Sequence, residues 1–274
     1  MPDFRCSIAG EDAAEPIAGT APTDTEWLFV EDAGPWAAKA TGHLAGLVPG
    51  GRAQLIRRHG GASGPGVRVF RANLTAGLTG APRVRTVLLD DVRELAEATA
   101  DSDTWTPYDE PLWLVCTNGR RDVCCAERGR PVAATLASRW PEATWETTHL
   151  GGHRFAATLL ALPYGVALGR LDRESAVSAC AELLAGRVPL DAARGRAGWP
   201  PAAQWADLHM RAEAGWTKID DVRLLAVDGL DVRLQTPDGD RTITVETSPG
   251  PALRASCADD SAKATTRHRI AGTG

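Results

Sequence analysis

The chain has 274 residues, of which 43% are hydrophobic and 24% are charged, a composition typical of globular proteins. This length suffices for one large domain or two small ones, and the composition excludes fibrous and disordered chains. The formal net charge is −5, from 30 basic and 35 acidic side chains. Such a mild acidic balance argues against a nucleic-acid partner.

No apolar run in the sequence approaches about 18 residues, so no membrane-spanning segment is expected. Residues 1–19 contain four carboxylates and no apolar stretch long enough for a secretory signal. We therefore expect a cytoplasmic protein with no membrane association. Six cysteines are too few for a disulfide scaffold, and a reducing compartment would keep them as thiols. Their spacing is therefore more informative than their number.

The first half of the chain has the pattern of a small α/β unit. Strands are predicted at 27–31, 53–58, 67–72 and 84–89, and helices at 35–47 and 92–99. A polar, turn-rich stretch at 98–111 then separates this unit from the next.

The second half gives the same order of elements. Strands are predicted at 112–116, 144–148, 155–162 and 166–169, and helices at 131–140 and 173–185. Pro131 suits the first position of a helix, where its missing N–H costs nothing. The segment WLFVEDAG at Trp27 also resembles WLVCTNG at Trp113. A strand, a helix and a closing hairpin in each half are typical of a thioredoxin-like sandwich, and duplication of one unit explains the repeat.

The pattern changes after Gly198. One helix is predicted at 201–214, followed by strands at 222–227, 230–235 and 241–246 that are separated by hairpin turns. The expected fold class is α/β, with two thioredoxin-like units, a C-terminal helix and a small antiparallel sheet. The predicted domains are residues 1–105, 106–190 and 191–257, followed by a mobile polar tail at 258–274.

Cysteine and histidine residues are concentrated at one predicted strand end. Cys116 ends a strand, and Cys124 and Cys125 follow in CTNGRRDVCC. His149 and His153 lie further along in HLGGH, where the two glycines allow the loop to curl and to direct both imidazoles to one point. Because rigid sheets hold functional groups at strand ends, two thiolates and two imidazoles are expected to converge at one sheet edge.

Three interpretations of this set follow from the residues. A Cys2His2 set can bind zinc or an iron–sulfur cluster, although eight residues separate Cys116 from Cys125 where a zinc finger has two. The cysteines can also be buried as small apolar residues, with HLGGH as a turn. A thioredoxin-type thiol oxidoreductase would use one of the three thiols, but the sequence has no C-x-x-C motif.

The segments VCTNGRRDVCCAERGRPVAATL and HLGGHRFAATLLALPYGVALGRLD resemble the sucrase/ferredoxin-like family, also described as thioredoxin-like ferredoxins with bis-histidine ligation. The resemblance is specific over 112–171, and the order of elements extends it to most of the chain. It implies a 2Fe-2S cluster held by Cys116, Cys125, His149 and His153. The resemblance thus also implies an electron carrier rather than a stand-alone enzyme. No paired carboxylates in the sequence indicate sugar hydrolysis.

Two details of the motif bear on this expectation. Asn118 stands where relatives often carry histidine, but this is not a ligand position. Cys124 lies next to the expected ligand Cys125, and it could substitute for that ligand or act as a redox-active thiol. The cysteine segment also carries four arginines that could dock an acidic redox partner: Arg120, Arg121, Arg128 and Arg130.

The charge of the expected cluster predicts proton-coupled reduction. Two ferric ions, two sulfides, two thiolates and two neutral imidazoles sum to zero, so one added electron leaves a negative charge. A nearby negative charge raises the pKa of an imidazole that keeps an exposed ring nitrogen. We therefore expect reduction to favour proton uptake at a histidine ligand.

Overall fold

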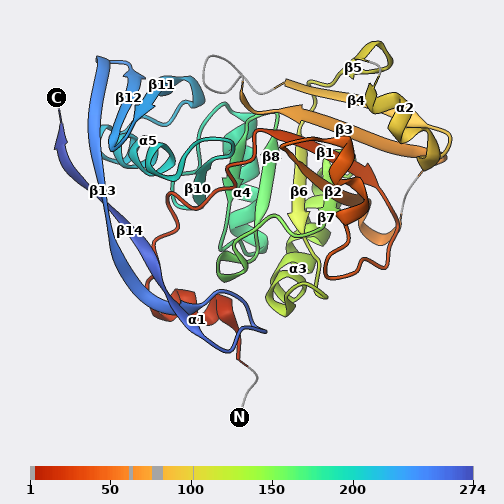
Figure 1. Cartoon of the computed structure of the whole chain (residues 1–274), viewed down its shortest axis with the longest axis horizontal. Coiled ribbons are helices and arrows are strands. Elements are labelled where there is room, and N and C mark those ends of the chain that lie inside the picture. Colours follow the sequence, from red (N-terminus) through yellow and green to blue (C-terminus); the bar gives the residue numbers. More distant parts are fainter. Residues whose placement is uncertain (1–3, 62–63, 76–82, 101, 274) are drawn as a thin grey trace.

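The structure is a computed structural model that describes residues 4–61, 64–75, 83–100 and 102–273. Among these residues, ten strands form one large mixed sheet, and four strands form a smaller antiparallel sheet beside it (Figure 1). The expected α/β class with a separate C-terminal antiparallel sheet is confirmed. None of the helices in the described ranges is both long enough and apolar enough to cross a membrane.

The first half of the chain forms one half of the large sheet. Its strands are β1 (Glu26–Glu31), β2 (Arg52–Arg57), β3 (Val67–Asn73), β4 (Arg83–Leu89) and the edge strand β5 (Thr106–Pro107). β1 is parallel to β2 and antiparallel to β3, which forms a hairpin with β4. The strand order is therefore β2-β1-β3-β4.

The second half forms the other half of the sheet. Its strands are β6 (Leu112–Cys116), β7 (Thr144–Thr147), β8 (Leu159–Leu162), β9 (Val166–Leu168) and β10 (Ala193–Arg196). β6 is parallel to β7 and antiparallel to β8, which forms a hairpin with β9. This order, β7-β6-β8-β9, is that of the first half, and the antiparallel pair β2 and β7 joins the two. The sheet thus runs across the boundary predicted at residue 105.

Alternating residues of the strands supply a core that the two halves share. Trp27 and Phe29 of β1 lie in the same buried cluster as Leu112 and Leu114 of β6. The opposite face of the second half is covered by α3 (Val123–Arg139) and α4 (Arg173–Leu184). The opposite face of the first half is covered by the 3-10 helix η1 (Gly42–Leu47) and by α2 (Leu95–Ala100), which follows the single turn η4 (Val92–Glu94).

Helix α3 begins eight residues before Pro131, so the predicted start was wrong. Oδ1 of Asp122 accepts the backbone N–H of Cys124 at 2.9 Å and caps the first turn. Pro131 lies inside the helix, where it cannot donate the usual hydrogen bond to the carbonyl of Glu127. The cap therefore determines the start of the helix, and the first turn includes Cys124 and Cys125.

Two further segments differ from the prediction. The helix expected at 35–47 is replaced by turns and η1, and Gly42 and Gly46 each disfavour a helix by about 1 kcal/mol relative to alanine. The strand expected from residue 155 begins at Leu159, because residues 153–155 form the 3-10 helix η6. His153 is therefore the first residue of η6 and precedes the strand.

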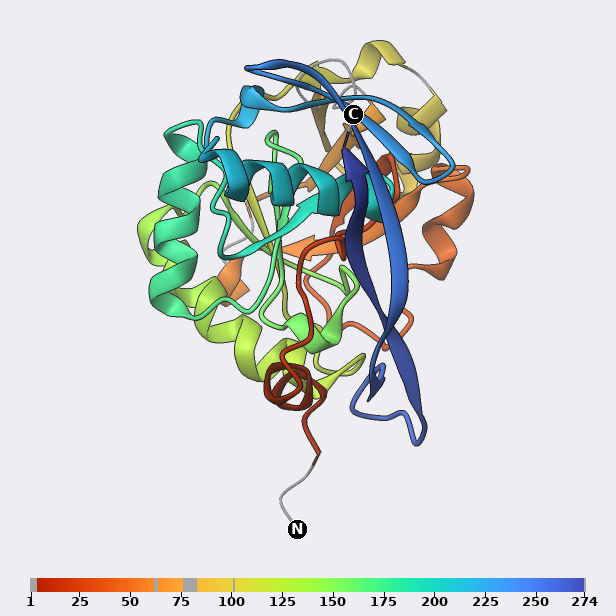
Figure 2. The same ribbon diagram turned by 90° about the vertical axis from the view of Figure 1, so that its left-hand side faces the viewer.

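The C-terminal region comprises α5 (Pro201–Ala214), β11 (Arg223–Asp228), β12 (Asp231–Thr236), β13 (Gly239–Arg254) and β14 (Ala262–Thr273). A mobile tail was expected at 258–274, but most of it forms β14, whose Thr265, Thr266 and Ile270 suit a strand. The long β13-β14 hairpin extends from the small sheet to the N-terminal helix α1 (Cys6–Asp12), as both views show (Figures 1 and 2). Segments from both ends of the chain are therefore neighbours.

Candidate metal centre

Cys116 and His149 meet because their strands are parallel neighbours. Cys116 is the last residue of β6, and His149 follows the end of β7 by two residues. The carboxyl ends of parallel neighbours lie at one edge of a sheet. Cys116 Sγ is 3.9 Å from His149 Nδ1. This contact brings together two of the four residues expected from the sequence.

Helix α3 brings Cys125 to the same edge. Its Sγ lies 3.9 Å from His149 Nδ1 and 3.6 Å from His153 Nδ1. Gly129, one turn further along α3, permits this approach, since a Cβ there would lie 2.1 Å from the carbonyl oxygen of Cys116. The close packing of α3 against the end of β6 therefore fixes the two thiols relative to one another.

The loop at 149–153 curls as its glycines suggest. Gly151 and Gly152 have φ values of +93° and +77°, a region that other residues rarely adopt. The rings of His149 and His153 are stacked, with centroids 3.7 Å apart and planes 7° from parallel. Both imidazoles consequently lie on the side of the loop that faces the thiols.

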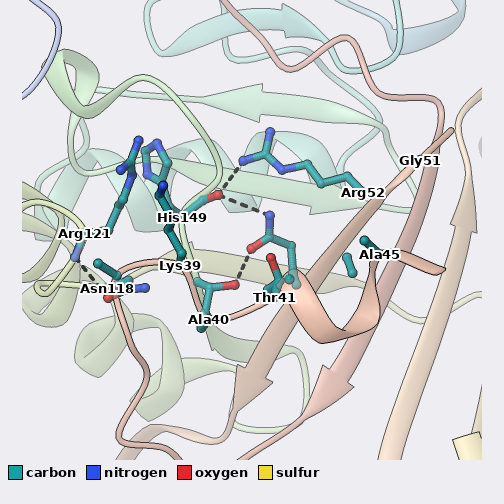
Figure 3. Close-up of a pocket in the computed structure, with 14 residues that line it drawn as sticks. Lys39, Ala40, Thr41, Ala45, Gly51, Arg52, Asn118, Arg121 and His149 are labelled. Atoms are coloured by element: carbon teal, nitrogen blue, oxygen red, sulfur yellow. Dashed lines mark hydrogen bonds between the residues drawn. The ribbon is translucent and has the colours of Figure 1, made fainter. Parts of the chain in front are cut away.

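Residues that sequence reasoning did not single out hold this loop in place. The carbonyl oxygen of His149 accepts hydrogen bonds from Arg52 and from Nε2 of Gln54, the latter at 3.1 Å (Figure 3). The carbonyl oxygen of Gly151 accepts from Nη1 of Arg194 at 3.1 Å. Arg194 is buried and belongs to β10, a strand that the sequence pattern did not predict.

Burial and hydrogen bonding set the charge of the donors. A hydrogen bond from the Cys125 thiol holds the pKa of the Cys116 thiol well below its usual value, and the same bond raises the pKa of Cys125. Burial, together with the neighbouring His149, lowers the pKa of His153 to about 4. His153 is therefore neutral near pH 7, which is the form in which imidazole binds a metal.

The ligand atoms of Cys116, Cys125 and His149 all lie within 4.8 Å of one another, a spacing that could hold a metal. His153 is outside this compact group but contacts Cys125. The structure thus gathers all four residues expected from the motif at one sheet edge, and it places Cys125, not Cys124, beside both histidines.

Residues 62–195 match the family described as Sucrase/ferredoxin-like. This match supports the family that the cysteine and histidine motifs indicated. The matched region, residues 62–195, contains all four residues of the candidate centre and ends before α5 and the small antiparallel sheet. No curated protein and no solved structure matches the chain.

A second group of thiols lies on the other side of the first turn of α3. Cys124 Sγ is 3.8 Å from Cys6 Sγ and 3.3 Å from Cys257 Sγ. Cys6 and Cys257 lie outside the matched region and 251 residues apart. Isolated cysteines so far apart give no spacing signal, so sequence reasoning missed this group.

The four arginines near the cysteines differ in their surroundings. Arg120, Arg121 and Arg130 are exposed. Arg128 instead forms an ion pair with Glu11, with Nη2 3.0 Å from Oε2. Its charge is thus compensated within the molecule, and the three exposed arginines are the ones available to a partner.

Proposed function

We propose that this protein transfers electrons through a 2Fe-2S cluster held by Cys116, Cys125, His149 and His153. The convergence of two thiols and two imidazoles from β6, α3 and the 149–153 loop, at 3.6 to 3.9 Å, carries the proposal. Such a cluster, when bound, supplies one-electron chemistry whose potential depends on the charge and burial of its surroundings.

The spread of the donors favours a two-iron cluster over a single zinc ion. The ligand atoms of a tetrahedral zinc site lie at most about 3.8 Å apart, given metal–sulfur bonds of about 2.3 Å. His153 Nδ1 is close to Cys125 Sγ, but His153 is not part of the group whose ligand atoms all lie within 4.8 Å. Two irons can be reached by donors that are too far apart to share one ion.

The exposure of the four residues suggests where electrons enter and leave. Cys116, Cys125 and His153 are buried, so water is largely excluded from that side of the site. His149 is partly exposed and lines a cavity of about 400 Å³ together with Lys39 and Arg121 (Figure 3). We propose that an acidic redox partner approaches His149 here, because positive charge beside the cavity attracts a carboxylate-rich surface.

The shared strand order supports a second part of the proposal, that the two halves arose by duplication of one unit. The orders β2-β1-β3-β4 and β7-β6-β8-β9 are what duplication of a thioredoxin-like unit would give. In the first half, the strand that corresponds to β6 ends at Glu31 where β6 ends at Cys116. Only the second half would then have kept the thiols that the cluster needs.

The visible absorption spectrum of the freshly purified chain, with iron and sulfide analysis, tests the function. We expect a coloured protein with about two irons and two sulfides per chain. Cys125→Ala should lose both the colour and the iron, whereas Cys180→Ala, which removes a buried thiol of α4, should keep them. A colourless protein with one zinc bound at Cys125 would instead indicate a structural zinc module.

A thioredoxin-type thiol oxidoreductase would also be colourless and would bind no iron. It would exchange a thiol with a small disulfide, and this exchange would depend on Cys116, Cys124 or Cys125. The same purified sample therefore separates the three functions that the sequence left open.

A further inference from the structure

Three thiols and one carboxylate form a compact group beside the first turn of α3. The thiols belong to Cys6 of α1, Cys124 of α3 and Cys257 of the turn between β13 and β14, and the carboxylate belongs to Asp122. The sulfur atoms are 3.3, 3.5 and 3.8 Å apart. Nothing in the proposed electron transfer uses this group.

The sulfur–sulfur distances suit one tetrahedral metal ion. With metal–sulfur bonds of about 2.3 Å, tetrahedral geometry places two sulfur ligands about 3.8 Å apart. An oxygen ligand at about 2.0 Å from the metal would lie about 3.5 Å from each sulfur. Oδ1 of Asp122 is 3.3 Å from Cys257 Sγ and 3.7 Å from Cys6 Sγ. Small adjustments would therefore place all four atoms around one ion.

The chemistry of the group also favours a cation. The side chain of Asp122 is fully buried, and its oxygens accept backbone N–H groups from Cys124 and Cys257. These bonds hold the carboxylate in place with Oδ1 facing the thiols of Cys6 and Cys257, where it could serve as the fourth ligand of a metal ion. Three sulfurs and one oxygen form a donor set that suits Zn²⁺ in a closed structural site, since softer Cu(I) prefers sulfur alone.

We propose that Cys6, Cys124, Cys257 and Asp122 hold a structural Zn²⁺. On binding, the ion takes the place of the thiol protons, which pass to water, and no electron is transferred. The ion would join α1, the start of α3 and the tip of the β13-β14 hairpin, which meet at this point (Figures 1 and 2). It would thus fix the two ends of the chain beside the turn that carries Cys125.

Zinc titration of a variant without the first site tests this proposal directly. The full chain with Cys116→Ala and Cys125→Ala is reduced, stripped of metal with a chelator and titrated with Zn²⁺ alone. We expect it to bind one equivalent. Adding Cys257→Ala should weaken binding by more than about 100-fold, because loss of a ligand should cost at least as much as loss of a group that supports one. Adding Cys180→Ala to the same background should change nothing.

The proposal of a structural zinc site is wrong if the variant with Cys257→Ala binds Zn²⁺ as tightly as its parent, or if the parent binds none. Mass spectrometry of the parent as purified, before reduction, would then show whether two of the three thiols form a disulfide, which would make the group a redox pair rather than a metal site.

A second measurement covers the case in which the multiple variants do not fold. X-ray absorption at the zinc edge of the unaltered chain should show about three sulfurs at about 2.3 Å and one oxygen at about 2.0 Å. Two nitrogens and two sulfurs around the zinc would place it at the candidate metal centre and overturn the proposal. Iron analysis of the same sample tests the proposed function separately, since Cys257→Ala should lower zinc and leave iron unchanged.

Discussion

Cys124 and Cys125 are consecutive residues of α3, yet their thiols belong to different groups. Cys125 Sγ lies 3.6 Å from His153 Nδ1, whereas Cys124 Sγ lies 3.3 Å from Cys257 Sγ. Successive residues of an α-helix point about 100° apart, so the first turn of α3 presents one thiol to each side. Asp122 lies at the junction, since it contacts Cys257 and its Oδ2 is 3.9 Å from His153 Nδ1.

This separation predicts opposite effects of two adjacent substitutions. Cys125→Ser should abolish the visible spectrum and the bound iron, because it removes a thiolate that faces both histidines. Cys124→Ser should leave the spectrum largely intact and reduce zinc instead. Iron and zinc analysis of the two variants, prepared side by side, provides the measurement. Loss of iron from Cys124→Ser alone would mean that the ligand has been assigned to the wrong thiol.

The contact between Gly129 and the end of β6 predicts a second outcome. In an ordinary helix, replacing glycine by alanine stabilises the protein by about 0.5 to 1 kcal/mol. Here the new Cβ would lie 2.1 Å from the carbonyl oxygen of Cys116, so Gly129→Ala should destabilise the fold by about 1 to 3 kcal/mol and lower the iron content. Urea unfolding measures the first effect. Gly42→Ala is the control, since nothing lies within 4 Å of its Cβ position.

The convergence of thiols and imidazoles could be predicted because its signals are local in the sequence. Cys116 ends a buried strand, and HLGGH contains the glycines that its turn requires, so spacing and strand ends predicted two thiols and two imidazoles at one edge. The choice of Cys125 over Cys124 came from the family resemblance. The start of α3 is a different case. Pro131 predicts a helix start that is eight residues too late, whereas Asp122 marks the true start because its side chain caps the backbone N–H of Cys124.

The second thiol group could not be predicted in this way. Cys6 and Cys257 come together only because the β13-β14 hairpin reaches back to α1, and no local pattern encodes a contact over 251 residues. The polar sequence after Ser256 predicted a mobile tail, because it has few apolar residues that would mark a strand. The segment instead forms β14 by pairing with β13, a contact that the local sequence does not show. Arg194 was missed for the same reason, because its role depends on a contact with Gly151 in another element.

The pH dependence of stability should reveal the role of Glu146, which joins β7 to β2. Burial raises its pKa, but hydrogen bonds from Arg57, Thr117 and His59 outweigh burial and hold the pKa below its usual value. A lowered pKa stabilises the folded state above the unfolded value of about 4.3, and this contribution is lost as the pH falls through the folded value.

We therefore expect Glu146→Gln to be less stable than the parent by about 1 to 3 kcal/mol near neutral pH, and the difference to shrink below about pH 4. Urea unfolding across this range measures it. Glu142→Gln is a suitable control, because the side chain of Glu142 is 91% exposed and its pairing with Arg58 should contribute little. If the difference in unfolding free energy between the parent and Glu146→Gln does not vary with pH, the charge of Glu146 is not what stabilises the pairing of β2 with β7.

Arg194 should tune the reduction potential of the proposed cluster. Burial lowers the pKa of its guanidinium to about 10. The negative charges of the Cys116 and Cys125 thiolates raise this pKa, so the positive charge of Arg194 interacts electrostatically with the cysteines of the proposed cluster. Arg194→Met should lower the potential by tens of millivolts, because a nearby positive charge favours the reduced form. Arg194→Lys keeps the charge and should stay near the parent. Equal potentials in the two variants would mean that the loop contact matters and the charge does not.

The last prediction concerns the coupling of reduction to proton uptake at the proposed cluster. Nδ1 of His149 faces the two thiols, so Nε2 is the ring nitrogen left to exchange a proton, and the partial exposure of His149 gives that proton access to water. An added electron leaves a negative charge that favours this proton. Over the pH range in which reduction is accompanied by this protonation, the potential should fall by roughly 59 mV per pH unit, which protein-film voltammetry from about pH 5 to about pH 10 would measure. His149→Cys should flatten this dependence more than His153→Cys, because His153 is buried and exchanges protons less readily. A potential that is already flat in the unaltered chain would mean that neither imidazole takes up a proton on reduction.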